Sequence, residues 1–391
     1  MKYNVIIVGA GIAGLTAGLE SAKLGLKVAI LEKEKNIGYP LSCGEYIPTP
    51  DELSKMFPNV DSFKKLLSYP KEFIRNKCGK TQVHGSSNRS WEFNLNSLVI
   101  NRPCLQQHLA DQCVSEGVTI HTGVTVDSFK PNGYLTLNGK NIPELNGDVC
   151  IAADGPTSRI ARNAGLNVPH MPYGLSPCQG YIMENVNLDS DVCHVFFGSK
   201  YAPGGYGWII PRGGNQANVG IGVRKSFMKD NQKLGLCLKH FIEQHPAVMT
   251  RLKHSKITEQ IHGLVPIAGP IPVTYATNIM VVGDAAGFVM ACNGGGIPTG
   301  VLSGYLAAQA AEKHLTEAKP LSIYEKAWKT QMGDVLETAV DIRKMMDRIM
   351  TNDSLMETLM DFAGSRRIGE MITCHIPFLI RMGYPLLRPF L

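Results

Sequence analysis

The sequence lacks the motifs that bind metals and the segments that cross membranes. Ten cysteines are scattered over 391 residues, yet none form a CxxC pair, and no HExxH occurs. Zinc and iron–sulfur sites therefore have no support, and the scattered thiols predict reduced cysteines in a cytoplasmic protein. The N-terminus does not have the pattern of a signal peptide, and no run of about 18 apolar residues predicts a spanning helix.

The charges are nearly balanced, which argues against a nucleic-acid-binding protein. The chain carries 39 Lys and Arg against 33 Asp and Glu, a net charge of +6. This excess suits a soluble protein, or one that touches an anionic membrane at the cytoplasmic face. Hydrophobic residues make up 44% of the sequence. That is enough for one large domain with an insertion, or for two domains.

The N-terminal residues predict a βαβ unit. Residues 3–8 are apolar and rich in β-branched side chains, as in a buried parallel strand. A helix of small residues is expected over 12–24 and a second strand over 27–32, with a glycine-rich turn at 9–14. This order is typical of a dinucleotide site.

The turn, GAGIAG, matches GxGxxG. Gly9 permits the tight turn, Gly11 lets the backbone approach a pyrophosphate, and Gly14 lets helix and strand pack closely. Glu32 ends the second strand, where a carboxylate can accept hydrogen bonds from ribose hydroxyls. The alternative is a glycine-rich turn without a ligand.

Two later motifs indicate FAD rather than NAD. Asp154-Gly155 follows a β-like segment, and Asp284 lies in the VVGDAAG segment after a buried strand. The order GxGxxG, DG, GD resembles that of flavin-dependent hydroxylases and other glutathione-reductase-like flavoproteins. The resemblance implies that Asp284 bonds the ribityl chain of FAD. Taken alone, Asp284 would also suit a helix N-cap.

Further positions are expected at the cofactor. The glycine-rich segment 293–297 opens a long helix over 297–314, and a helix N-terminus there would favour reduced, anionic flavin. The resemblance implies one further contact to the flavin side of FAD and one to its adenine. The residues assigned are Gly295, Gly296 and Ile297 at the isoalloxazine, Arg102 at the flavin side and Val126 at the adenine. The alternatives are that residues 293–297 form an ordinary turn, that Arg102 is a solvated side chain at a helix start, and that Val126 is a strand residue without a ligand.

The strongest resemblance lies in the middle of the chain. Residues 203–211, PGGYGWIIP, resemble the PxxYxWxFP signature of geranylgeranyl reductases, with Ile210 where that family has Phe. The segment 217–222, ANVGIG, is also similar to the family. Residues 38–45, GYPLSCGE, resemble its loop ending in Cys-Gly-Glu, with Leu-Ser in place of Val-Arg before the Cys.

The resemblance implies an α/β fold. We expect a glutathione-reductase/p-hydroxybenzoate-hydroxylase-like FAD-binding fold, with an inserted antiparallel β-sheet substrate region and a helical C-terminus. The expected segments are 1–60, 100–165 and 276–320 for FAD binding, 61–99 and 166–275 for substrate and catalysis, and 321–391 for the helical region.

It also implies a reaction. Members saturate C=C bonds of geranylgeranyl chains, on archaeal-type ether phospholipids or on a diphosphate, by hydride transfer from N5 of reduced flavin. If the alkene is protonated first, Tyr206 and Trp208, on one strand face, could stabilise a carbocation through cation–π contact. Cys43, which with Gly44 is expected near the flavin, is the candidate proton donor. The alternatives are aromatics packed in a core and a Cys that acts as a small hydrophobe.

The sequence also fits two other functions. One is an FAD-dependent monooxygenase or halogenase that uses oxygen, and another is a non-catalytic prenyl-binding protein. The electron donor could be a ferredoxin, reduced F420 or NAD(P)H. The tail from Ile376 mixes apolar residues with Arg381 and Arg388, which suits either peripheral membrane contact or internal packing.

Overall fold

The structure is a computed structural model. It describes residues 2–377 except 88, 131, 132, 134, 139–144, 167–172 and 231, and of 135–138 it describes the backbone alone. Nearly all of the tail for which membrane contact is hypothesised lies outside the described residues.

The first sheet has six strands in the order β15-β16-β9-β1-β2-β6. All its pairs are parallel except β15·β16, which is antiparallel. Its strands are β1 (Lys2–Val8), β2 (Val28–Glu32), β6 (Thr119–Thr122), β9 (Asn146–Ala152), β15 (Tyr275–Ala276) and β16 (Ile279–Val281). The central strands are almost entirely buried, as their continuous apolar runs predict.

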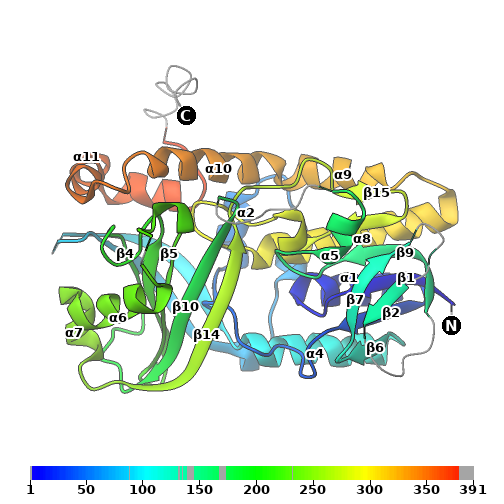
Figure 1. Cartoon of the computed structure of the whole chain (residues 1–391), viewed down its shortest axis with the longest axis horizontal. Helices are drawn as coiled ribbons and strands as arrows, with labels where there is room; N and C mark the ends of the chain where they lie inside the picture. Colours follow the sequence, from blue (N-terminus) through cyan, green and yellow to red (C-terminus); the bar gives the residue numbers. More distant parts are fainter. Residues whose placement is uncertain are drawn as a thin grey trace.

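Helices α1 (Ile12–Lys23), α4 (Arg102–Ser115) and α8 (Ile297–Glu317) pack together beside this sheet (Figure 1). The predicted first helix, second strand and long glycine-initiated helix are confirmed to within a few residues. Gly25 and Gly117 follow the ends of α1 and α4 with φ of +81° and +85°, a backbone conformation that glycine adopts without strain.

The second sheet has eight strands in the order β14-β10-β13-β12-β11-β4-β5-β3. They are β3 (Tyr46–Pro48), β4 (Ile74–His84), β5 (Ser90–Ile100), β10 (Leu175–Glu184), β11 (Val192–Phe196), β12 (Tyr206–Gly213), β13 (Gln216–Gly222) and β14 (Lys256–Pro266). The expected antiparallel sheet includes one parallel pair, β11 and β4. The chain leaves β4 through β5 and returns more than 100 residues later, so a hairpin does not set this pairing.

The C-terminal helices cover both sheets along one long side of the molecule (Figure 1). They are α9 (Ser322–Trp328), a π-helical segment (Lys329–Gly333), α10 (Asp334–Asp347) and α11 (Asp353–Ile372). The remaining elements are α2 (Pro50–Met56), α3 (Phe63–Leu66), α5 (Arg159–Asn163), α6 (Leu234–Gln244), α7 (Pro246–Leu252), the ribbon β7 (Thr125–Phe129) with β8 (Leu135–Asn138), and 3₁₀ turns at Lys71–Phe73, Lys225–Phe227 and Gly283–Ala286.

Separate apolar clusters hold these layers together. The largest surrounds the first sheet and the helices beside it. A second joins the other sheet to α6 and α7, and a third packs α11 on β4 and β5. Within the described ranges, no helix is both long enough and apolar enough to span a bilayer.

The crossing of α1 and α8 depends on glycine at one position. A Cβ on Gly304 would lie 2.3 Å from the backbone oxygen of Ala13, whereas a Cβ on Gly300, one turn earlier, would lie 3.6 Å from the Ala13 Cβ. The first distance is too short for atoms that are not bonded, and the second is an ordinary contact. Only Gly304 therefore has to lack a side chain for the two backbones to meet.

We predict that Gly304→Ala lowers the free energy of unfolding by about 1–3 kcal/mol, because α8 must move away from α1. Gly300→Ala is the matched control. It should be neutral or stabilise by up to about 1 kcal/mol, through helix propensity. Urea unfolding of the cofactor-free protein measures both. Equal stability of the two variants would contradict the close crossing.

Candidate active site

A cavity of about 980 Å³ is lined by residues of both sheets. Except for Gly14, every site residue predicted from the sequence lines it. These residues are Gly9, Gly11, Glu32, Cys43, Gly44, Arg102, Val126, Tyr206, Trp208, Asp284, Gly295, Gly296 and Ile297. The structure therefore brings together residues that lie almost 290 positions apart in the sequence.

The three glycines of the first turn differ in what they face. Gly9 has φ +104°, and a Cβ there would lie 2.2 Å from the Ala153 oxygen. A Cβ on Gly14 would lie 2.0 Å from the Gly9 oxygen, so both glycines are explained by packing within the protein. A Cβ on Gly11 would meet no protein atom within 4 Å and would project into the cavity. Gly11 thus suits the close approach of a ligand such as a pyrophosphate.

Glu32 presents a fixed carboxylate at the end of β2. Its Oε2 accepts a hydrogen bond from the Ala10 N–H at 2.6 Å, and its Oε1 accepts one from the Glu34 N–H at 2.8 Å. The remaining lone pairs can accept ribose hydroxyls. Val124 donates its N–H to the Glu32 carbonyl at 2.8 Å, which brings the start of β7 and buried Val126 beside this end of the cavity.

Asp284 and Arg102 face the cavity from two different elements. Burial raises the pKa of Asp284, and the nearby Arg102 cation acts in the opposite direction. The Arg102 Nε is buried without a hydrogen-bond partner among the described residues. An unsatisfied buried donor costs about 1–3 kcal/mol, so a ligand acceptor at this position would be stabilising.

The N-terminus of α8 lies at the cavity, after a loop whose own N–H groups are bonded within the protein. Gly294 has φ +74°, and the Asn293 Oδ1 accepts the Gly295 N–H at 2.8 Å. The first N–H groups of α8, from Gly296 onward, have no partner inside the helix and lie at its positive end. Such an end would stabilise negative charge on a flavin ring.

These features together fit FAD. An open glycine cradle, a ribose-binding carboxylate, a buried Asp, an unpartnered Arg nitrogen and a helix N-terminus all face one cavity.

The middle motif, Asp154-Gly155, has a structural role. Asp154 accepts the Ser158 hydroxyl at 2.5 Å and the Arg159 N–H at 2.8 Å, and so caps α5.

The Cys-Gly-Glu loop is held to the second sheet by a buried ion pair. Glu45 is fully buried, has φ +64°, and its Oε2 lies 2.7 Å from the Nε of Arg212. Burial raises the pKa of Glu45, and the Arg212 cation partly offsets this effect. The Cys43 Sγ accepts the Glu45 N–H at 3.2 Å, so this anchored residue also orients the thiol.

Tyr206 and Trp208 form one aromatic wall on β12. Their ring centroids are 6.2 Å apart. The Tyr206 hydroxyl donates to the Asn293 carbonyl at 2.5 Å, and the Trp208 Nε1 donates to the Asn218 Oδ1 at 2.9 Å. A Cβ on Gly220 would lie 2.5 Å from the indole, so this glycine leaves the space that the ring occupies.

The sequence reasoning missed the role of Asn218. This residue is fully buried on β13, and its Nδ2 donates to the Cys43 carbonyl at 2.9 Å. It therefore links the aromatic wall to the Cys43 loop through a single amide. An amide in the otherwise apolar ANVGIG segment was the available signal, because buried amides require partners.

Comparisons with known proteins agree with this geometry. The family described as geranylgeranyl reductase catalytic domain matches residues 175–265, and that described as FAD binding domain matches residues 4–43. The chain is 31% identical over 373 residues to digeranylgeranylglycerophospholipid reductase 2 of Methanothermobacter thermautotrophicus, covering 92% of each chain. It is 32% identical to the digeranylgeranylglycerophospholipid reductase of Methanocaldococcus jannaschii, covering 91% of this chain and 90% of that one. The chain belongs to the geranylgeranyl reductase family.

Solved structures extend this comparison. A geranylgeranyl bacteriochlorophyll reductase-like protein of Thermoplasma acidophilum superposes with a TM-score of 0.82 at 26% identity, over 100% of this chain and 99% of that one. A flavin-dependent brominase superposes with a TM-score of 0.71 at 16% identity over the whole of both chains, which shows the fold alone. This member of the geranylgeranyl reductase family is thus an FAD-dependent oxidoreductase with the predicted fold.

We predict that Gly11→Ala weakens FAD binding about tenfold or more while leaving the unfolding of the FAD-free protein unchanged. The new methyl group would meet no protein atom but would occupy cradle space. Fluorescence titration of the apoprotein with FAD measures the affinity. Gly235→Ala, on the exposed side of α6, is the control and should bind FAD normally. An unchanged affinity in Gly11→Ala would remove this residue from the cofactor site.

Proposed function

We propose that this protein saturates C=C bonds of geranylgeranyl chains carried by an archaeal-type ether phospholipid. The observation that carries the proposal is the hydrogen-bonded link through buried Asn218 between Trp208 and the Cys43 backbone, since both of these residues line the cavity that fits FAD. It joins an aromatic wall to a thiol-bearing loop, which supports a shared role for the two. The names of the relatives support this substrate over a free diphosphate.

The aromatic wall suits an intermediate with positive charge. An isolated alkene is a poor hydride acceptor, and protonation converts it into a carbocation that accepts hydride readily. A cation near the face of Tyr206 or Trp208 gains about 0.5–2 kcal/mol from each favourable contact. When bound, reduced FAD supplies the hydride that completes the saturation.

The hydrogen bonds of the wall support Cys43 as the proposed proton donor. The Tyr206 hydroxyl already donates to Asn293, and the Trp208 N–H donates to Asn218. Cys43, in contrast, uses its sulfur as an acceptor for the Glu45 N–H, so its own proton remains to be given. The same N–H would stabilise the thiolate that donation leaves behind.

We also propose an electron donor and a membrane contact for the enzyme. The electrons come from a ferredoxin, reduced F420 or NAD(P)H, and the lipid is taken from a membrane that the protein contacts peripherally. The prenyl tail of such a substrate is too apolar to cross water freely. Assays with each donor, and with vesicles in place of detergent, rank these possibilities.

We predict that the dithionite-reduced holoprotein, kept free of oxygen, reoxidises its flavin when digeranylgeranylglyceryl phosphate is added. Mass analysis should show the lipid gaining two hydrogens for each bond reduced. Geranylgeranyl diphosphate is the comparison substrate and should react more slowly. Flavin that stays reduced until oxygen enters would instead favour a monooxygenase.

We further predict that Cys43→Ser lowers turnover tenfold or more, because an alcohol is a far weaker acid than a thiol, with FAD still bound. Cys178→Ser is the matched control. Cys178 also lines the cavity, and burial raises the pKa of its thiol to about 12, so it should stay protonated and be dispensable. Steady-state kinetics on both variants decide the point. Full activity of Cys43→Ser would end the proton-donor assignment.

A further inference from the structure

Two cysteines from distant parts of the chain meet beside the cavity. Cys292 precedes the loop that opens α8 and lines the cavity, whereas Cys374 follows the end of α11 and is only 4% exposed. Their Sγ atoms lie 3.6 Å apart, and both thiols are free. The residues between them in sequence include all of α8, α9, α10 and α11.

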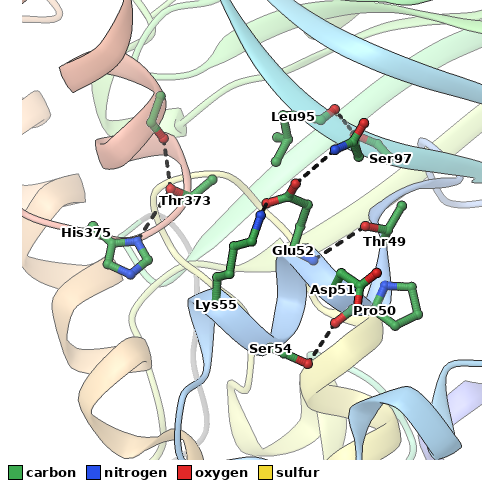
Figure 2. Close-up of polar contacts among 12 residues, drawn as sticks. Thr49, Pro50, Asp51, Glu52, Ser54, Lys55, Leu95, Ser97, Thr373 and His375 are labelled. Atoms are coloured by element: carbon green, nitrogen blue, oxygen red, sulfur yellow. Dashed lines mark hydrogen bonds and ion pairs between the residues drawn. The ribbon is translucent and has the colours of Figure 1, made fainter.

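Hydrogen bonds already hold the two segments in register. The Asn293 Nδ2 donates to the Ile372 carbonyl at 2.8 Å and also approaches the Cys374 Sγ at 3.9 Å. Cys374 has φ +63°, a conformation that L-residues rarely adopt. The residues on either side of Cys374 in sequence, Thr373 and His375, contact each other where α11 ends (Figure 2), with 3.4 Å between Oγ1 and Nδ1. Cys374 is therefore fixed opposite Cys292 by its surroundings.

We propose that Cys292 and Cys374 form a reversible disulfide that ties the end of α11 to the loop before α8 and slows the enzyme. A disulfide needs its sulfurs about 2.05 Å apart, so closure requires an approach of roughly 1.5 Å. This movement is small, but it acts on residues of the site. Asn293, adjacent to Cys292, accepts the Tyr206 hydroxyl through its carbonyl and the Gly295 N–H through its side chain.

The oxidation can proceed by ordinary thiol–disulfide exchange with a small disulfide such as oxidised glutathione. The Cys292 thiolate attacks one sulfur and releases the first glutathione thiolate. The Cys374 thiolate then attacks the Cys292 sulfur, forms the protein S–S bond and releases the second. Two protein thiols are oxidised, one small disulfide is reduced, and the two protons end on the two glutathione thiols.

The order of attack follows from the environment of each thiol. Cys292 is half-buried and faces the cavity, through which a small molecule can enter. Its hydrogen bond to Cys374, together with burial, raises the pKa of the Cys374 thiol. Cys374 therefore stays protonated and protected until Cys292 carries the mixed disulfide. In a reducing compartment such a bond would be transient, as regulatory disulfides are.

The test maps the bond directly in the full-length, FAD-loaded enzyme. The protein is incubated with oxidised glutathione, its free thiols are alkylated, and it is digested without reduction. We expect one cross-linked peptide pair that joins residues 292 and 374, and its loss on dithiothreitol treatment. Exposed Cys104 is the internal control, because it should gain glutathione under the same conditions.

A second experiment compares the turnover of the enzyme before and after oxidation. Because a displacement of about 1 Å at a reacting site can cost up to 100-fold, we expect the oxidised enzyme to be tenfold slower or more, and dithiothreitol to restore it. Cys292→Ser, which can form neither the mixed disulfide nor the cross-link, should turn over equally fast with and without oxidised glutathione, and Cys104→Ser should still be inhibited. A Cys292 that stays reduced, or takes glutathione without the cross-link, while Cys104 reacts would overturn the disulfide. Unchanged turnover of the cross-linked enzyme would overturn its regulatory role. If Cys292→Ser does not fold, the peptide map of the natural chain still decides.

Discussion

The approach of α1 to α8 is the contact on which the cofactor site depends. Gly304 lets the α8 backbone pass so close to Ala13 that the two helices share one side of the first sheet. Their first turns then line the same cavity, at Gly11 and at Gly296. Two positive helix ends thus converge, one suited to the phosphates and the other to the flavin ring. A wider crossing would separate these ends, and a single dinucleotide would no longer contact both.

The second sheet contributes chemistry because a few polar contacts fix it to the first. The Tyr206 hydroxyl reaches the loop before α8, and Asn218 reaches the Cys43 loop. Glu45 and Arg212 form a buried ion pair that would be costly to break, by about 3–5 kcal/mol on loss of one partner. The proposed thiol donor is therefore anchored to the sheet that carries the aromatic wall.

Local sequence signals predicted much of this arrangement. The βαβ unit and the long α8 follow from glycine motifs whose geometry is set within a few residues, and the FAD-binding fold was implied by the family resemblance. The individual roles of Cys43, Tyr206 and Trp208 remain predictions, although the structure gathers them at one cavity. What the sequence did not reveal depends on pairing between distant segments. The Glu45–Arg212 ion pair spans 167 residues, and the parallel β11·β4 pair needs the register of a whole sheet.

Ile210, which stands where the family typically has Phe, lies beside the loop that ends in Cys-Gly-Glu. A Cβ on Gly44 would lie 3.1 Å from the Ile210 Cδ1, so this side chain touches the same loop in which Leu41 and Ser42 replace Val and Arg. Leu41 packs instead with Ile182 and Ile261, so the two departures from the family pattern lie in separate contacts of one loop. A chimera that exchanges the strand alone would therefore alter the packing at Gly44 and leave the contacts of Leu41 unchanged.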